Sequence, residues 1–548
     1  MIRRPRCSPF LPILLLAGCA MPHAVISAPV TQPDTGASIT FIHLNDSYRI
    51  DDVRAENPAN KMVGGLGRVA TVLEQLHKNG DRVELLHGGD FLFPSLEGDV
   101  FKGLKMVKAL DYLHAMAPLT VVPGNHEFDK SQKTFEAAVN ESKFRWIGSN
   151  IKFDTKKPKV DQKLEPAHWI DVGKHKVAVF GLTLSEPGQN EYVKVDPDYV
   201  HVAEKTIEAL KNQGAEAIIA LSHLISADDL KIAQLKQKYP ELIWVASAHE
   251  HTSGFHAGNV NQAVITRGAS NARTVWKIEL SFDAQSRPQL STSELKMDNS
   301  IAWHSGYENT IAKPTRQELL QKLPFLEHVV GRAAVDLDGR EEVIRTREST
   351  WGNYITDQMT TMFPDLKVDF AFLNGGSIRV DDIIRDDITI EDIWRSFGFP
   401  TPLRYMQLKG DDFRERVLTN AYDSSDPAPG RFLQFSAGIR VCVDTAPLTT
   451  RDKRVVQAQV PDASGGWRDI DDDELLAVVA PGYISEGGDD YDYGEKAVIA
   501  TPAAGDAKYL ILGEILEDTA DGKNIGQRLD PANPRFAVLS KGQNVCFR

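Results

Sequence analysis

Residues able to bind metal ions and transfer protons cluster in residues 124–129, Gly-Asn-His-Glu-Phe-Asp, directly after the β-branched run at 120–122. An amide, an imidazole and two carboxylates within this short segment suit metal binding and acid–base chemistry. A capped helix start is the alternative, because Asn favours a cap and acidic residues favour the first turn. The surrounding sequence has to decide between the two.

Short apolar runs before and after this segment end in residues of the same type. We expect strands at residues 39–44, 83–86, 119–122, 177–182, 217–221 and 242–246. The segments that follow five of these strands contain Asp46, Asp90, Asn125, His126, His223, His249 and His251. A lone Asp is commonly a cap and a lone His a structural residue. Five strand ends of this kind indicate one site, because α/β folds gather their chemistry at the carboxyl ends of their strands.

The strands alternate with amphipathic segments, which predicts an α/β fold. We expect helices at residues 66–78 and 101–116 and a first domain at 38–300. A linker helix, at 315–323 within residues 301–326, then leads to a second α/β (α+β) domain at 327–548.

The ordered set of Asp46, Gly89-Asp90, residues 124–127, His223 and His249-x-His251 resembles the calcineurin-like metallophosphoesterases. Residues 347–357 and 374–379 resemble the C-terminal domain of the 5′-nucleotidase branch of that family. The resemblance implies a four-layer metallophosphoesterase β-sandwich flanked by helices, a linker helix that serves as a hinge, and a substrate-binding domain.

The resemblance also implies two divalent metal ions, of Zn, Mn, Co or Mg. Asp90 would bridge the ions, because a dinuclear site needs a shared anionic ligand. Asp46 and His251 would complete the first site. The second site would use Asn125, His223 and His249. A metal-activated hydroxide would then attack phosphorus.

By the same resemblance, His126 is the catalytic histidine and Asp129 is the partner that orients its ring. Glu127 would have a structural role. Tyr48 departs from the family pattern, which has histidine at this position. This departure has three possible consequences. Tyr48 would line the site while water fills the ligand position, or the first metal ion would differ in identity. Alternatively, the site would be half-active.

Four residues of the second domain are expected to bind substrate. Arg379 follows two glycines and offers a planar fork to phosphate. Phe432 and Tyr491 match the two rings that sandwich the base in the family, and Asp489 would support the second ring. Asp490 departs from the family pattern. The alternatives are a surface role for Arg379 and a core role for Phe432.

The implied function is release of phosphate from nucleoside 5′-monophosphates or related nucleotides by a metal-dependent phosphoric ester hydrolase. Other substrates in the family's range are UDP-sugars, 2′,3′-cyclic nucleotides and thiosulfate esters. A non-catalytic nucleotide-binding relative is a further alternative, because of Tyr48. The net charge of −14 argues against nucleic acid as a partner, and no protein partner is evident.

The N-terminus predicts export. Residues 1–18 resemble a lipoprotein signal peptide that ends before Cys19, and residues 19–37 would form a tether. Lipid on Cys19 would anchor the chain in a bacterial envelope, in the outer membrane facing the periplasm or at the cell surface. Cys442 and Cys546 remain, either as an export-compatible disulfide or as buried thiols.

Overall fold

The computed structural model describes residues 38–56, 62–153, 163–186, 191–422, 430–444, 455–494, 498–499, 505–529, 532–539 and 545–547. The expected signal peptide, tether and Cys19 lie outside the described residues. Within these ranges, no helix has both the length and the apolar character that crossing a bilayer requires.

Two sheets pack face to face in the N-terminal part of the described chain. One has seven strands in the order β17 (Pro288–Lys296), β16 (Thr274–Phe282), β1 (Ser38–Leu44), β4 (Val83–His87), β5 (Leu119–Val121), β6 (Arg145–Ile147) and β8 (Leu164–Glu165). The other has six, in the order β14 (Gly254–His256), β15 (Val264–Arg267), β13 (Leu242–Ser247), β12 (Ala217–His223), β10 (His175–Thr183) and β9 (Ala167–Val172). Phe41, Leu86 and Trp244 belong to the apolar cluster between them.

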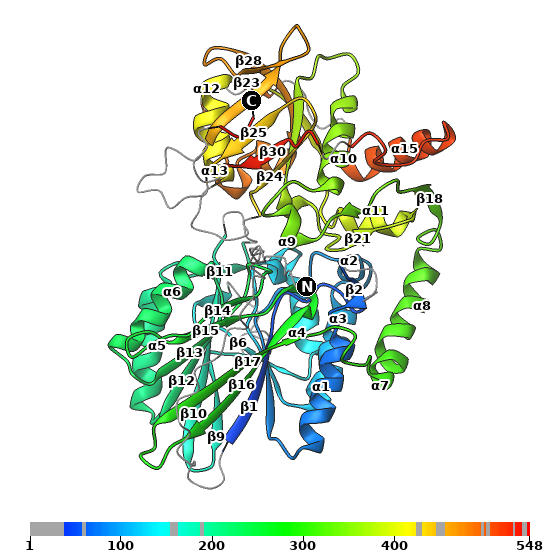
Figure 1. The fold of residues 1–548 in the computed structure, drawn as a ribbon. Helices are drawn as coiled ribbons and strands as arrows, with labels where there is room; N and C mark the ends of the chain where they lie inside the picture. Colours follow the sequence, from blue (N-terminus) through cyan, green and yellow to red (C-terminus); the bar gives the residue numbers. More distant parts are fainter. Residues whose placement is uncertain are drawn as a thin grey trace, which may run out of the picture.

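Helices cover the outer face of each sheet (Figure 1). On the seven-stranded sheet lie α1 (Leu66–Lys78) and α3 (Leu104–Met116), and on the six-stranded sheet lie α5 (Tyr199–Asn212) and α6 (Ser226–Gln234). Helix, sheet, sheet and helix form four layers, which confirms the predicted fold class.

One predicted helix is divided. The sequence pattern predicted a single helix at 101–116, whereas the structure has α2 (Leu96–Phe101) and then α3. Lys102 (φ 55°) and Gly103 (φ 77°) between them adopt left-handed backbone conformations, which end a helix. The apolar spacing continues across this break, so the pattern alone did not reveal it.

The linker contains α7 (Ser305–Tyr307), the π-helix η5 (Glu308–Ala312) and α8 (Lys313–Lys322).

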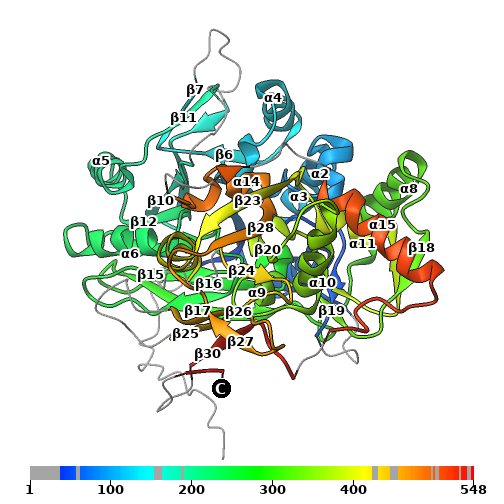
Figure 2. The ribbon, with the colours of Figure 1, turned by 90° about the horizontal axis from the view of Figure 1, so that it is seen from above.

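The second domain follows the linker. One of its described sheets consists of β24 (Leu433–Phe435), β20 (Phe370–Asn374), β28 (Leu475–Pro481), β23 (Leu403–Lys409) and β29 (Val498–Ile499). A second consists of β27 (Trp467–Asp469), β26 (Val455–Pro461), β25 (Arg440–Val443) and β30 (Phe536–Val538). The larger helices of this domain are α10 (Thr350–Met359), α11 (Ile390–Ser396) and α15 (Ala507–Ala520). Seen from above, strands β20, β23 and β28 of this domain lie over the middle of the first, while α15 extends toward the side of α8 (Figure 2).

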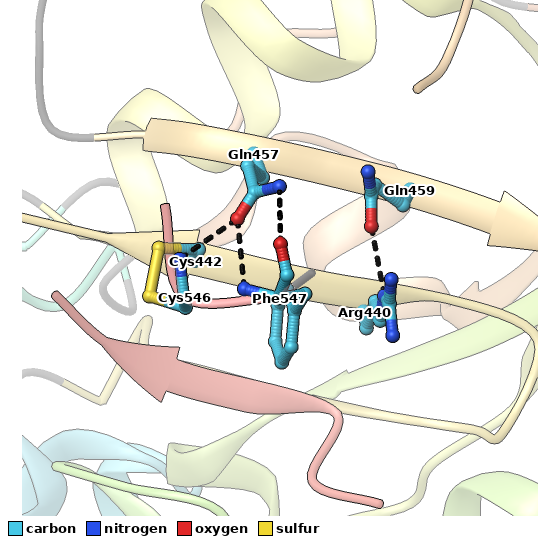
Figure 3. The surroundings of a disulfide bond; sticks show 6 residues. All are labelled: Arg440, Cys442, Gln457, Gln459, Cys546 and Phe547. Carbon is cyan, nitrogen blue, oxygen red and sulfur yellow. Dashed lines mark hydrogen bonds between the residues drawn. A yellow bond between two sulfur atoms is a disulfide. The ribbon is translucent and has the colours of Figure 1, made fainter. Parts of the chain in front are cut away.

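A disulfide joins Cys442 on β25 to Cys546, with the two Cα atoms 5.7 Å apart (Figure 3). Gln457 accepts hydrogen bonds from the backbone N–H groups of Cys546 (2.9 Å) and Phe547 (3.0 Å). The guanidinium carbon of Arg440 lies 4.6 Å from the centre of the Phe547 ring. Of the two sequence alternatives for these cysteines, the structure therefore has the disulfide.

Charged side chains join the two domains across a buried interface. Arg395 on α11 donates two hydrogen bonds to Glu97 on α2, at 2.9 and 2.6 Å. Both side chains are almost fully buried. Arg395 also donates a hydrogen bond to Glu391 of its own helix at 2.8 Å. Removing Arg395 would leave Glu97 buried without this partner, and such a loss typically costs about 3–5 kcal/mol. The stability of the interface therefore depends on an acid at position 97 of the first domain and a cation at position 395 of the second.

Candidate active site

Two groups of ligand side chains meet at the carboxyl ends of the parallel strands. One contains Asp90, His223 and His249, and the other contains Asp46, Asp90 and His251. Within each group the ligand atoms lie within 4.8 Å of one another. Asp46 and Asp90 are fully buried, and buried carboxylates in proteins are paired or bind metal ions. Carboxylate and imidazole donors in two groups that share one aspartate fit two divalent metal ions.

The backbone at four of these ligands is unusual. Asp46 (φ 48°), Asp90 (φ 57°), His249 (φ 77°) and His251 (φ 59°) all occupy the left-handed region. Residues other than glycine adopt this conformation rarely, and it is concentrated at functional sites. The fold therefore imposes a specific direction on these side chains.

Glu127 organises the loop that carries Asp90. Its carboxylate accepts backbone hydrogen bonds from Asp90 (2.7 Å), Phe91 (2.8 Å), Leu92 (3.0 Å) and Gly124 (2.6 Å). A Cβ on Gly124 would lie 2.1 Å from Asp90 Oδ1, so this position requires glycine. The contacts give Glu127 the structural role expected from the sequence.

Asn125 and His223 lie together beside Asp90. His223 Nδ1 contacts the carbonyl oxygen of Gly88 at 2.6 Å, and its Nε2 lies 3.0 Å from Asn125 Oδ1 and 3.2 Å from Asp90 Oδ2. Because a carbonyl only accepts, Nδ1 carries a proton, and Nε2 faces the oxygen atoms of Asn125 and Asp90. Burial lowers the pKa of the neighbouring His249 to about 3, which keeps that imidazole neutral and able to bind a metal ion.

His126 borders the ligand groups and also lines a cavity. Its Nδ1 lies 2.9 Å from Asp129 Oδ2, and its backbone N–H donates to Asp90 Oδ1 at 2.9 Å. Burial opposes the imidazolium form, but the carboxylates of Asp129 and Asp90 outweigh it and raise the pKa of His126 to about 9. His126 is therefore held as a charged proton donor, with Nε2 free of the Asp129 contact.

Tyr48 lies among the ligands of the Asp46–Asp90–His251 group. Its hydroxyl is 3.1 Å from Asp90 Oδ2, 3.1 Å from His251 Nε2 and 3.4 Å from Asp46 Oδ1. Burial raises the pKa of Tyr48 well above its usual value, so the phenol keeps its proton. Tyr48 thus lines the site as a neutral hydrogen-bonding group.

Two residues of the second domain, Arg379 and Glu341, contact this group. Arg379 stacks over the ring of Tyr48, with its guanidinium carbon 4.9 Å from the ring centre. Its Nη2 is buried without a hydrogen-bond partner among the described residues. Glu341, the first residue of α9 (Glu341–Ile344), accepts a hydrogen bond from His251 Nδ1. Arg379 and Glu341 of the second domain therefore contact residues of this ligand group in the first.

A cavity of about 550 Å³ opens between the domains at this point. His126 and Asp129 line it from the first domain, and Arg345, Arg379 and Phe399 from the second. The volume lies within the range typical of small-molecule sites, about 300–1,000 Å³. The cavity is therefore large enough for a small molecule, which would lie beside His249, His251 and the two arginines.

The two predicted base-binding rings, Phe432 and Tyr491, do not line this cavity. Phe432 is 5% exposed and packs edge-on against Tyr422 and Phe536, and Tyr491 is 4% exposed, with its hydroxyl donating to the carbonyl of Arg431. Both belong to the apolar core of the second domain in this arrangement.

Asp489 does line the cavity, and it accepts hydrogen bonds from Tyr483 (2.9 Å) and Asn374 (2.8 Å). Tyr483 is 57% exposed and lines the cavity as well. The sequence reasoning missed Tyr483, although it follows strand β28 in the same way that the metal-type residues follow theirs. Glu341 was also missed, because no local pattern indicates a partner 90 positions away.

Comparison with known proteins agrees with this geometry. Residues 39–253 match the family model for calcineurin-like phosphoesterase, and residues 329–495 match the 5′-nucleotidase C-terminal domain. The first domain with its ligand groups defines a metal-dependent phosphoric ester hydrolase. With the second match, the chain belongs to the phosphoesterases that carry a 5′-nucleotidase C-terminal domain.

Individual relatives are distant but extensive. The 5′-nucleotidase of Homo sapiens is 26% identical over 84% of this chain and 85% of that protein. The trifunctional nucleotide phosphoesterase protein YfkN of Bacillus subtilis is 27% identical over 83% of this chain, which spans only 32% of that longer protein. The crystal structure of a 5′-nucleotidase precursor from Thermus thermophilus covers 92% of this chain and 100% of its own, with a TM-score of 0.76. At 23% identity this last likeness shows the fold.

Proposed function

We propose that this protein removes the phosphate of nucleoside 5′-monophosphates with two divalent metal ions. The observation that carries the proposal is the pair of donor groups sharing Asp90, which faces a cavity with Arg379 on its far side. The relatives named 5′-nucleotidase support this choice of substrate.

The chain supplies ligands, positive charge and a proton. Asp46 and His251 with Asp90 would hold one ion, and Asn125, His223 and His249 with Asp90 the other. Divalent ions held there supply Lewis acidity toward the phosphoryl oxygens and make water a nucleophile at neutral pH. Arg379 lines the same cavity, and its Nη2 is buried without a hydrogen-bond partner among the described residues, which suits binding of a phosphoryl oxygen.

His126 is suited to the leaving group. Asp129 holds its Nδ1, so Nε2 carries the proton that passes to the departing ester oxygen. The nucleoside then extends along the cavity toward Phe399, Tyr483 and Asp489. Flat rings stack on any base, and the carboxylate of Asp489 offers an acceptor to hydroxyl or amino groups.

The decisive experiment measures metal content and phosphate release from AMP on the mature chain, with Mn²⁺, Zn²⁺, Co²⁺ or Mg²⁺ added in turn. We expect two ions per chain and rapid release. UDP-glucose and 2′,3′-cyclic AMP serve as competing substrates. Two bound ions with preferential turnover of either competitor would replace the proposed substrate, and no turnover of any of the three would contradict the proposal.

We also propose that lipid on Cys19 anchors the protein in a bacterial envelope. The residues Leu16-Ala17-Gly18-Cys19 and the disulfide between Cys442 and Cys546 support an exported chain. Labelling with radioactive palmitate should mark the wild-type protein and leave Cys19→Ala unlabelled. Equal labelling of both proteins, or of neither, would contradict the anchor.

A further inference from the structure

A carboxylate of the second domain contacts a ligand histidine of the first. His251 Nδ1 is hydrogen-bonded to Glu341 Oε2, and the two side chains are only 3% and 2% exposed. A carboxylate accepts hydrogen bonds and does not donate them, so Nδ1 of His251 carries the proton. In the neutral imidazole, which is the form that binds a metal ion, the lone pair of His251 is then on Nε2.

That lone pair points into the Asp46–Asp90–His251 group. His251 Nε2 lies 3.1 Å from Asp46 Oδ1 and 3.1 Å from the hydroxyl of Tyr48. Histidines that bind metal ions usually donate their other ring N–H to an acceptor, which fixes the tautomer and the ring orientation. Glu341 occupies this position toward His251.

Glu341 is itself placed by contacts that cross the domain boundary. Its backbone N–H donates to Asp381 Oδ1 at 3.0 Å, while Asp381 Oδ2 accepts from Ser270 (2.9 Å) and Asn271 (2.6 Å) of the first domain. Asn271 also accepts the backbone N–H of Tyr48 at 2.9 Å. The hydrogen bonds that hold Glu341 therefore continue, through Asp381 and Asn271, to the backbone of Tyr48, which lies among the ligands of this group.

The second group has no such requirement. The corresponding proton acceptor for His223 is the carbonyl oxygen of Gly88, which belongs to the first domain. Among the described residues, His223 therefore takes its acceptor from the first domain and His249 Nδ1 has no hydrogen-bond partner, whereas His251 takes its acceptor from the second domain.

We propose that Glu341 is a positioning residue for the ion held by Asp46, Asp90 and His251. It orients His251 from the second domain and thereby makes the affinity for that ion depend on contact between the domains. The inference rests on the proposed two-ion site and adds to it a role for a residue outside the expected ligand set.

The test measures Mn²⁺ binding by titration calorimetry on wild type, Glu341→Ala and Glu341→Gln. In Glu341→Ala we expect one of the two ions to bind roughly 10- to 100-fold more weakly, the usual effect of removing such a partner, and the other to be unchanged. Glu341→Gln should lose less, because the amide oxygen still accepts from Nδ1. Electron paramagnetic resonance at two equivalents of Mn²⁺ should show a coupled pair in wild type and a single-ion spectrum in Glu341→Ala.

Two further variants separate positioning from a general effect on the fold. Glu342→Ala changes the next residue, whose half-exposed carboxylate pairs with Arg340, and should bind both ions like wild type. His251→Ala should lose the same ion, and adding Glu341→Ala to it should cause no further loss, because both residues act through one ligand.

Wild-type affinity for both ions in Glu341→Ala would overturn the inference. So would equal weakening of both ions, or a change confined to the KM for AMP, which would assign Glu341 to the neighbouring Arg345 and Arg379 instead. A wild-type chain that binds fewer than two ions would refute the proposed function, and the inference with it.

Discussion

The two ligand groups share Asp90 but are supported in different ways. The group with His223 and His249 is held within the first domain, by backbone groups such as the carbonyl of Gly88. The group with Asp46 and His251 also contacts Tyr48 and, through His251, Glu341 of the second domain. One half of the site is therefore complete in its own domain, whereas the other half includes contacts from both.

Breaking the shared ligand should have the largest effect. Asp90→Asn removes the carboxylate that belongs to both groups, and Asn125 cannot replace its charge. We expect loss of both ions and activity at the background level, checked by metal analysis and phosphate release. Retained activity would contradict a site built on Asp90, and a retained ion would show that the groups do not depend on it equally.

Replacing His126 should leave both groups intact. His126→Ala removes the proton donor, and general acid catalysis is typically worth about 10²–10⁴-fold in rate. We expect kcat to fall by this factor while metal content stays at the wild-type value. A parallel loss of metal would show that His126 supports the ligands instead.

Exchanging Tyr48 should sharpen the difference between the groups. Tyr48→His adds an imidazole to the group that contains a neutral phenol. We expect this group to bind its ion roughly tenfold more tightly, or about 1.4 kcal/mol, with no change in the other. Calorimetry with Mn²⁺ tests this, and Tyr48→Phe is the control, because it removes the hydroxyl without adding a ligand. Unchanged affinity in Tyr48→His would mean that this position does not face the ion.

The smallest expected effect concerns the partner of His126. The Asp129 carboxylate raises the pKa of His126, so Asp129→Asn should lower it. The proton donor is then lost at lower pH, and the alkaline limb of the kcat/KM profile should move down by roughly one pH unit. An unchanged limb would assign that titration to another group.

Much of this arrangement was predictable from the sequence. Helix α1 begins and ends at the expected residues, and Asp46, Asp90 and His223 meet because parallel strands bring their carboxyl ends to one edge. Local pattern and strand direction are properties that a single sequence carries. Residue type and strand position were therefore enough to propose one site at this edge, and the resemblance to the calcineurin-like metallophosphoesterases divided its residues into two ligand groups.

Other features depend on contacts between distant segments. The left-handed backbone at His249 and His251 has no signal in residue type. The burial of Phe432 and Tyr491 follows from how strands of the second domain pack. The partnership of His251 with Glu341 depends on how two domains meet, which neither domain's pattern encodes.

The buried pair between Arg395 and Glu97 bears on how such chains can be recombined. Glu97 of the first domain accepts two hydrogen bonds from Arg395 of the second, whereas Arg395 also pairs with Glu391 of its own domain. A hybrid that joined this first domain to a second domain lacking the arginine would bury Glu97 without a counter-charge. A hybrid of this kind would therefore need a second domain that supplies a cation at the position of Arg395, or a first domain without the acid at the position of Glu97.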